Sequence, residues 1–294
     1  MIFQVERADL LVETSWLAEH LNDPQIRIVD MRGYVRTVEH DGVQDALYIG
    51  APDEYARGHI PGAVYIDWSS DIVDLDDTVE AQIAPPARFA EVLGNLGIGD
   101  QHLVVAYDAH PTSQFATRLW WALKYYGHKR VVVLNGGLAK WQSEGRPLVE
   151  SIPVYPAATF TPAIQVRLRA TAVEVLSQLG QEDAVLIDAR DRGQFSGAIA
   201  RGHGRRGHIP GALSIPREEV IDPATGTFRS NEELTQLFSK AGVQPEQKIV
   251  AYCNGGVAAT TILFSLALLG YDNLTNYDGS WNEWGSRQDL PIEV

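Results

Sequence analysis

The sequence predicts an α/β protein made of two tandem copies of one domain, each a parallel sheet covered by helices on both faces. The 294 residues are enough for two domains of ordinary size. The hexapeptide GHIPGA occurs twice, at 58–63 and at 207–212. Short apolar runs alternate with segments of helical periodicity, which is the pattern of parallel sheets flanked by helices.

Further sequence markers repeat in the same order as the hexapeptide. They are DMR (30–32) with DAR (188–190), VVAYD (104–108) with IVAYC (249–253), and NGGLAKW (135–141) with DGSWNEW (278–284). The offset between the hexapeptides is 207 − 58 = 149 residues, and the other offsets lie between 143 and 158. Four ordered markers at similar offsets indicate a duplicated domain of about 130–145 residues.

A proline-rich segment separates the two copies. Prolines stand at 147, 153, 156 and 162. Because proline fixes φ and favours extended neighbours, this segment is expected to be a stiff linker. We therefore expect an N-terminal domain over 1–147, a linker over 148–162 and a C-terminal domain over 163–294.

The expected elements follow in order within each copy. In the first copy, strands are predicted at 28–29, 103–107 and 131–134, with helices at 89–96 and 114–126. In the second, strands are predicted at 184–187 and 249–252, with helices at 232–241 and 260–269. Gly270 is a suitable residue to end the last of these helices.

Composition excludes several classes of protein. With 24 basic and 38 acidic residues the net charge is −14, which repels phosphate backbones, so nucleic-acid binding is not expected. No apolar run approaches the ~20 residues of a membrane helix, and the N-terminus lacks a signal-peptide core, so we expect a cytoplasmic protein without membrane association. A single cysteine excludes an internal disulfide and a cysteine zinc cluster, and no metal site is expected.

That cysteine, Cys253, lies between a predicted strand and a predicted helix in AYCNGGVAATTILF. Ligands of parallel α/β sheets bind beyond the carboxyl ends of the strands. Gly255 and Gly256 allow consecutive backbone N–H groups to turn towards an anion, and the helix N-terminus adds a positive end. This order favours a reactive thiolate over a merely buried cysteine before a glycine turn.

Two other cysteine chemistries fit this sequence less well. A cysteine phosphatase needs an arginine six residues after the cysteine, where this chain has Ala259. A papain-like nucleophile needs a partner histidine, which the sequence cannot place in space. His59 and His208 recur in both copies although one copy has no cysteine, so we interpret them as structural.

Taken together, these motifs resemble the tandem-domain rhodanese-type sulfurtransferases, the family of thiosulfate and 3-mercaptopyruvate sulfurtransferases. The resemblance covers nearly the whole chain. It rests on Asp-x-Arg and GHIPGA in both copies, on RLWW (118–121) with Gly127-His128 and NGGLAKW, and on CNGGVA (253–258) with YDGSW (277–281).

The resemblance implies two rhodanese-like domains and a sulfurtransferase that needs no cofactor. Cys253 would take a sulfane sulfur from a small donor, hold it as a persulfide, and pass it to a thiophilic acceptor such as cyanide, a thiol or a thioredoxin-like protein. The rest of the loop would bind substrate through Asn254, Gly255, Gly256, Val257 and Ala258. Asp108 stands at the cysteine's position in the first copy, which would make that copy catalytically inactive and one wall of the cleft.

Asp188 and Arg190 are expected to support the loop, because the same pair recurs as Asp30 and Arg32 in the copy without a cysteine. Most of the tryptophans are interpreted as core residues. Trp281, which follows the YDGS turn, is the one expected to reach the cleft.

The choice of donor depends on where the chain departs from the family. Its loop has neither the basic residues usual in the thiosulfate enzymes nor the serine of the Cys-Gly-Ser-Gly-Val loop, whose place Gly255 takes, and this neutrality favours 3-mercaptopyruvate. Gln194 replaces the arginine that commonly grips the donor's anionic end. Arg190–Arg206 holds five arginines where about 24 × 17/294 ≈ 1.4 basic residues are expected. Within it, Arg201, Arg205 and Arg206 are the predicted anion site.

Two further function classes stay open at this point. One is a non-catalytic module that uses the fold for protein interaction, which Asp108 fits in the first copy. The other is a sulfur relay whose acceptor is a cysteine of a partner protein.

Overall fold

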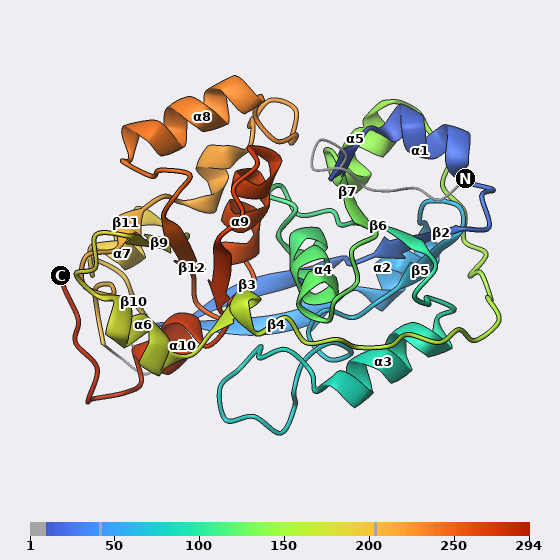
Figure 1. Ribbon diagram of the computed structural model, residues 1–294. Coiled ribbons are helices and arrows are strands. Elements are labelled where there is room, and N and C mark those ends of the chain that lie inside the picture. Colours follow the sequence, from blue (N-terminus) through green and yellow to red (C-terminus); the bar gives the residue numbers. More distant parts are fainter. Residues whose placement is uncertain (1–9, 41–42, 203–204) are drawn as a thin grey trace.

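The computed structural model describes residues 10–40, 43–202 and 205–294, and these form two five-stranded parallel sheets joined by a smaller third sheet (Figure 1). The strand order is β1-β7-β6-β2-β5 in the first sheet and β11-β9-β12-β13-β8 in the second. The two orders correspond strand for strand, which confirms the predicted duplication and fold class.

The first copy contributes its sheet and five helices. Its strands are β1 (Leu11–Val12), β2 (Ile26–Asp30), β5 (Ala63–Tyr65), β6 (Leu103–Tyr107) and β7 (Val131–Leu134). Its helices are α1 (Thr14–His20), α2 (Pro52–Arg57), α3 (Pro86–Asn95), α4 (Gln114–Tyr125) and α5 (Gly137–Ser143).

The second copy repeats this arrangement. Its strands are β8 (Arg169–Ala170), β9 (Ala184–Asp188), β11 (Leu213–Ser214), β12 (Lys248–Tyr252) and β13 (Leu274–Tyr277). Its helices are α6 (Ala172–Gln178), α7 (Arg192–Phe195), α8 (Asn231–Lys240), α9 (Ala259–Leu268) and α10 (Ser280–Trp284), with short 3-10 helices at Val166–Leu168 and Arg217–Val220. The segment 150–165 between the two copies forms neither helix nor strand.

Alternate strand residues enter two separate cores, so each sheet is covered on both faces. In β6, Val104 and Ala106 pack with residues of α3 and α4, whereas Val105 packs with Leu17 of α1 and Trp141 of α5. The second sheet divides in the same way, with α8 and α9 on one face and α6 and α10 on the other.

The equivalent helices α4 and α9 pack against each other where the copies meet. The hydroxyls of Thr117 and Thr260 are 2.9 Å apart, and the rings of Trp120 and Phe264 meet edge to face at 5.1 Å. One hydrophobic core therefore runs through both copies. This brings the N-termini of both helices, and the loops before them, to the same region of the molecule.

The third sheet is built from insertions and was not predicted. β3 (Gly33–His40) and β4 (Val43–Gly50) form an antiparallel hairpin between β2 and α2, which has no counterpart in the described part of the second copy. β4 pairs in parallel with β10 (Ala200–Arg201), an insertion of the second copy. Figure 1 shows the hairpin extending from the N-terminal copy towards β10 and α10. The sheet therefore joins the two copies beside the end of β12.

Among the described residues, no helix has both the length and the apolar character needed to span a membrane.

Candidate active site

Cys253 directly follows β12 and is 3% exposed. Its N–H donates to Ser280 Oγ at 3.1 Å, and its carbonyl accepts from the N–H of Trp281 at 3.0 Å. The next carbonyl, that of Asn254, accepts from the N–H of Asn282 at 2.8 Å. The cysteine loop is therefore anchored to the start of α10.

Gly256 shapes the middle of this loop. Its φ of +69° lies in the left-handed region, and a Cβ there would be 2.8 Å from the carbonyl oxygen of Asp278. The Gly256 carbonyl accepts from Asn276 Nδ2 at 2.9 Å and from Arg118 Nη1 at 3.2 Å. Glycine is therefore required here for both conformation and space.

Arg118 reaches the loop from α4 of the other copy. It is buried, and its Nη1 lies 2.5 Å from Asp278 Oδ1 while Nη2 donates to the Ala81 carbonyl at 2.9 Å. The second oxygen of Asp278 accepts from the N–H of Ile83 at 3.0 Å and lies 3.2 Å from Arg169 Nε. The N-terminal copy therefore holds the cysteine loop in place.

Cys253 opens onto a cavity of about 120 Å³ whose walls come from both copies. The hairpin and the rest of the N-terminal copy supply Val35, Thr37, Tyr48, Trp68, His110 and Gln114. The C-terminal copy supplies Arg201, Arg217, Cys253, Asn254, Gly255, Val257 and Ala258. Of the predicted substrate-binding loop residues, Gly256 alone is missing from this wall.

The three predicted anion-site arginines are not brought together. Arg201 lines the cavity, but Arg205 Nη1 donates to the carbonyls of Arg287 at 2.6 Å and Leu290 at 2.8 Å. Arg206 Nη1 donates to the carbonyls of Gly197 at 3.3 Å and Ala198 at 3.2 Å. The side chains of Arg205 and Arg206 therefore bond to nearby backbone carbonyls and do not line the cavity at Cys253.

Sequence reasoning missed Arg217, the second arginine of the cavity wall. Its Nη2 lies 2.9 Å from Glu218 Oε1, while its Nε is buried and has no acceptor among the described residues. The missed signal is its position, three residues after β11 ends and so at the carboxyl edge of the sheet. An unpartnered N–H of this kind is available to an anion in the cavity.

His110 lines the N-terminal side of the cavity. Burial, helped by the positive charge of Arg217, lowers the pKa of His110 to about 4, so the imidazole is neutral at physiological pH. Arg201 and Arg217 therefore supply the cationic charge of the cavity wall.

Gln194 is buried and accepts from Asn254 Nδ2 at 3.0 Å. The residue that replaces the family's arginine therefore holds the loop side chain next to the cysteine and contributes no charge.

The Asp188–Arg190 pair lies behind the site. Arg190 Nη2 is 2.6 Å from Asp188 Oδ2 and donates to the Gly207 carbonyl at 2.8 Å, and neither residue lines the cavity. This ties β9 to the GHIPGA turn, beside Tyr252, whose hydroxyl accepts from the N–H of Ile209.

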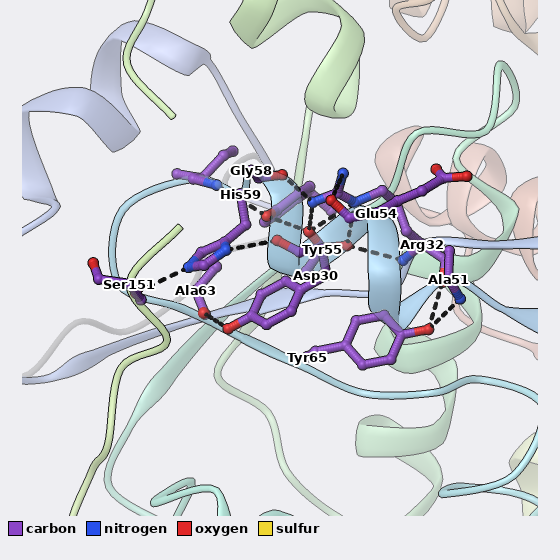
Figure 2. Close-up of polar contacts among 12 residues, drawn as sticks. Asp30, Arg32, Ala51, Glu54, Tyr55, Gly58, His59, Ala63, Tyr65 and Ser151 are labelled. Atoms are coloured by element: carbon purple, nitrogen blue, oxygen red, sulfur yellow. Dashed lines mark hydrogen bonds and ion pairs between the residues drawn. The ribbon is translucent and has the colours of Figure 1, made fainter. Parts of the chain in front are cut away.

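The first copy repeats this network without a cysteine. Arg32 Nη2 lies 2.6 Å from Asp30 Oδ2 and donates to the Gly58 carbonyl at 2.7 Å. Figure 2 shows these contacts, with His59 between Tyr55 and Ser151. The recurrence of the same contacts agrees with a supporting role for both pairs.

The two GHIPGA histidines lie outside the cavity. His59 stacks on Tyr55 and His208 on Phe195, and Nδ1 of each ring bonds to the carbonyl of the residue on which the ring stacks.

Trp281 is 4% exposed beneath Arg190 and lines a neighbouring cavity of about 380 Å³. In the described residues, no group of three or more His, Cys, Asp or Glu side chains is placed to hold a metal ion.

Comparison with known proteins places this geometry among relatives. The rhodanese-like domain family matches residues 13–144 and 171–287. The chain is 36% identical over 285 residues to the 3-mercaptopyruvate sulfurtransferase of Escherichia coli K12, covering 96% of this chain and 97% of that protein. It is 35% identical over 296 residues to the sulfur carrier protein TtuD of Thermus thermophilus, covering 97% and 96%.

A solved structure has the same architecture. The crystal structure of SseA from Escherichia coli, described as a 3-mercaptopyruvate sulfotransferase with the rhodanese fold, aligns with a TM-score of 0.81 at 33% identity. The alignment covers 92% of this chain and 98% of that one.

Proposed function

This chain belongs to the rhodanese family and is a sulfurtransferase of the 3-mercaptopyruvate and thiosulfate type, and we propose that Cys253 carries the transferred sulfur as a persulfide. The observation that carries this proposal is the position of the chain's only cysteine, at the carboxyl end of β12 on the wall of a cavity shared by both copies. The same observation disfavours a purely non-catalytic interaction module.

The first half-reaction loads the cysteine. The Cys253 thiolate attacks the donor's sulfane or thiol sulfur, a new S–S bond forms, and the rest of the donor leaves as sulfite or pyruvate. In the second half-reaction the acceptor attacks the outer sulfur and the Cys253 thiolate is released. Cyanide then leaves as thiocyanate, and a thiol leaves as a persulfide.

The loop and α9 favour the negative charge on sulfur. The loop 254–258 contains no cationic side chain, so the stabilisation comes from backbone N–H groups and from the positive N-terminal end of the ten-residue helix α9. This arrangement suits a persulfide anion and requires no cofactor.

Arg201 and Arg217 bind the anionic end of the donor. Both line the cavity that holds Cys253, and Arg217 Nε is buried without an acceptor among the described residues. A guanidinium matches the oxygens of a carboxylate or sulfonate. This pair takes the role expected for Arg201, Arg205 and Arg206.

The N-terminal copy, residues 1–147, acts without transferring sulfur, and the C-terminal copy, residues 163–294, is catalytic. Asp108 stands where the second copy has Cys253, and a carboxylate cannot accept a sulfane sulfur. The contribution of the first copy is the cavity wall and the Arg118 contact with the cysteine loop.

A sulfur relay is the second candidate function, favoured by the similarity to TtuD, which is named a sulfur carrier protein. In that function the acceptor is a cysteine of a partner, such as a thioredoxin-like protein. The two functions share the Cys253 persulfide and differ in the acceptor.

The test measures loading and unloading separately. Intact-protein mass spectrometry after incubation with 3-mercaptopyruvate or thiosulfate should show the mass of one added sulfur atom, and cyanide should remove it. Steady-state kinetics with both donors, and with cyanide, a small thiol and a thioredoxin-like protein as acceptors, then identify the reaction. Turnover with small acceptors supports the enzyme, and transfer to the protein thiol alone supports the relay. Donor-dependent transfer retained by Cys253→Ser would refute the persulfide proposal.

A further inference from the structure

The β3–β4 hairpin places a tyrosine of the inactive copy in the active-site cavity. The backbone of β4 is fixed to the catalytic copy by its pairing with β10, in which Val43 lies opposite Ala200 and Gln44 opposite Arg201. The N–H of Gly202 donates to the Gln44 carbonyl at 2.9 Å. The hairpin is therefore held against the same short strand that carries Arg201 of the cavity wall.

Tyr48 lies on β4 and lines this cavity. Its ring meets the buried Trp68 edge to face at 5.4 Å, and its hydroxyl accepts from Asn282 Nδ2 at 3.2 Å. The hydroxyl oxygen is 3.4 Å from the point that a Cβ on Gly255 would occupy. It therefore lies against the cysteine loop, two residues from Cys253.

The hydroxyl proton of Tyr48 is available to a ligand. Asn282 donates to the phenol oxygen, and no acceptor for the phenol's own proton occurs among the described residues. Burial raises the pKa of Tyr48, so the group is protonated at neutral pH. The other hydroxyl of the cavity wall, that of Thr37, belongs to an exposed residue. Tyr48 is thus the better placed hydrogen-bond donor beside the loop.

We propose that the Tyr48 hydroxyl donates a hydrogen bond to the keto oxygen of an α-keto thiol donor and stabilises the enolate that leaves when Cys253 takes its sulfur. This inference rests on the proposed function and deepens it, because it assigns the donor class as an α-keto thiol of the 3-mercaptopyruvate type. It also gives the inactive copy a part in the chemistry.

The step balances without a further reactant. The Cys253 thiolate attacks the donor thiol, an S–S bond forms, and the C–S bond breaks. The electron pair of the broken bond passes into the adjacent ketone as an enolate, whose oxygen receives the Tyr48 hydrogen bond. The proton that the transferred sulfur carried is then delivered to the enolate carbon, which gives pyruvate and leaves the persulfide as an anion.

Thiosulfate provides an internal contrast. Its transfer breaks an S–S bond, and sulfite leaves with the electron pair and forms no enolate. Inorganic polysulfide likewise leaves as a sulfur anion. A hydrogen bond to an enolate oxygen therefore assists the α-keto thiol and neither of the other donors.

The experiment compares Tyr48→Phe with Tyr34→Phe. Tyr34 lies in the same hairpin, but its hydroxyl bonds to Glu54 and it does not line the cavity, so it is a matched control. Single-turnover loading of Cys253 is followed by mass spectrometry with 3-mercaptopyruvate, thiosulfate and inorganic polysulfide. Alkylation by a neutral reagent reports whether the thiol stays accessible.

We expect Tyr48→Phe to load from 3-mercaptopyruvate about 10- to 100-fold more slowly, with the loss in the loading rate at saturating donor, because one hydrogen bond to a developing anion is removed. Loading from thiosulfate and polysulfide, and the alkylation rate, should change less than about threefold, and Tyr34→Phe should match the wild type. An equal loss with all three donors, or no loss with 3-mercaptopyruvate, would overturn the role of Tyr48. A wild-type protein that no donor loads would instead overturn the proposed function.

Discussion

The loops after β6 and β12 occupy equivalent positions in the two copies but begin with residues of different chemistry. Each runs for six residues to the next helix, from Asp108 to Gln114 (114 − 108 = 6) and from Cys253 to Ala259 (259 − 253 = 6). In the first loop the Asp108 carboxylate accepts three backbone N–H bonds, from His110 and Phe115 at 2.8 Å and from Ala116 at 2.9 Å. A side chain of the protein therefore fills the anion position of the first copy.

The second loop has no carboxylate at that position. Cys253 lies on a cavity wall instead, whereas Asp108 is 1% exposed and lies outside the cavity. One strand–loop–helix unit therefore encloses a protein carboxyl in the first copy and lies open to a cavity in the second. The first residue of the loop distinguishes the two, because Asp108 brings an acidic group of its own to the backbone N–H donors and Cys253 does not.

The titration of Asp108 reflects two opposing effects. Burial raises the pKa of this carboxyl to about 7, although its three N–H donors act in the opposite direction. The group is therefore expected to titrate near neutral pH, where the comparison of the two loops can be tested.

The largest effect is expected when the loop proposed to carry the sulfur loses its cysteine. Cys253→Ser should reduce donor-dependent sulfur transfer by at least about 1000-fold, because a hydroxyl cannot hold a sulfane sulfur. The double variant Cys253→Ser with Asp108→Cys should be equally inactive, because position 108 is buried away from the cavity. Transfer restored by the cysteine at 108 would show that the two loops are interchangeable.

The next effect tests how far the cysteine loop depends on its contacts with the first copy. Arg118→Met should lower the free energy of unfolding by about 3 kcal/mol, because it breaks a buried ion pair with Asp278 and removes a donor to Gly256. Urea unfolding measures this loss. Arg169→Met is the control, since Arg169 contacts the same carboxylate from a side chain that is 32% exposed, and its loss should be smaller. Equal losses would contradict the special role of Arg118.

A smaller effect, on the pH dependence of stability, should come from the closed loop. The folded-state pKa of Asp108, about 7, exceeds the ~3.9 of an unfolded chain, so the folded protein binds the proton more tightly. The stabilisation that this tighter proton binding gives the folded state is fully present below pH ~4 and is lost as the pH rises through 7. The difference in unfolding free energy between wild type and Asp108→Asn should therefore shrink by roughly 2 kcal/mol from pH 5 to 7.5.

The measurement for that prediction is urea unfolding of both proteins across this pH range. A difference that stays constant would mean that Asp108 is ionised throughout and that its three N–H donors outweigh burial. The comparison between a resident carboxylate and a bound anionic sulfur would then be closer still.

An effect of similar size is expected from the two arginines that are proposed to bind the donor's anionic end. Arg201→Ala and Arg217→Ala should each lower kcat/KM for the sulfur donor by about 10- to 100-fold, as expected for one charged hydrogen-bond partner. Arg205→Ala and Arg206→Ala should stay within about threefold of the wild type, because their guanidinium groups bond to carbonyls outside the cavity. Near-wild-type kinetics for both Arg201 and Arg217 variants would remove the proposed anion site.

Much of the fold followed from local patterns. The predicted strand at 103–107 agrees with β6, and the predicted helices at 114–126 and 260–269 agree with α4 and α9 to within one residue at either end. These segments are apolar runs that are buried along almost their whole length, so that periodicity and length decide the structure. The hairpin was missed although Asp41-Gly42, between two β-rich runs, is a strong turn signal.

The sequence was sufficient to predict the duplication, the alternation of strands and helices in each copy, and the position of Cys253 between a buried strand and a helix. These features follow from residue spacing, because the backbone has few regular conformations and apolar periodicity marks the buried face of each element. Only the folded chain shows that the hairpin pairs with β10, that Tyr48 and Arg217 line the same cavity as Cys253, and that Arg205 and Arg206 do not. Such contacts join segments up to about 200 residues apart, and their geometry depends on how the whole chain closes its loops, which local spacing does not encode.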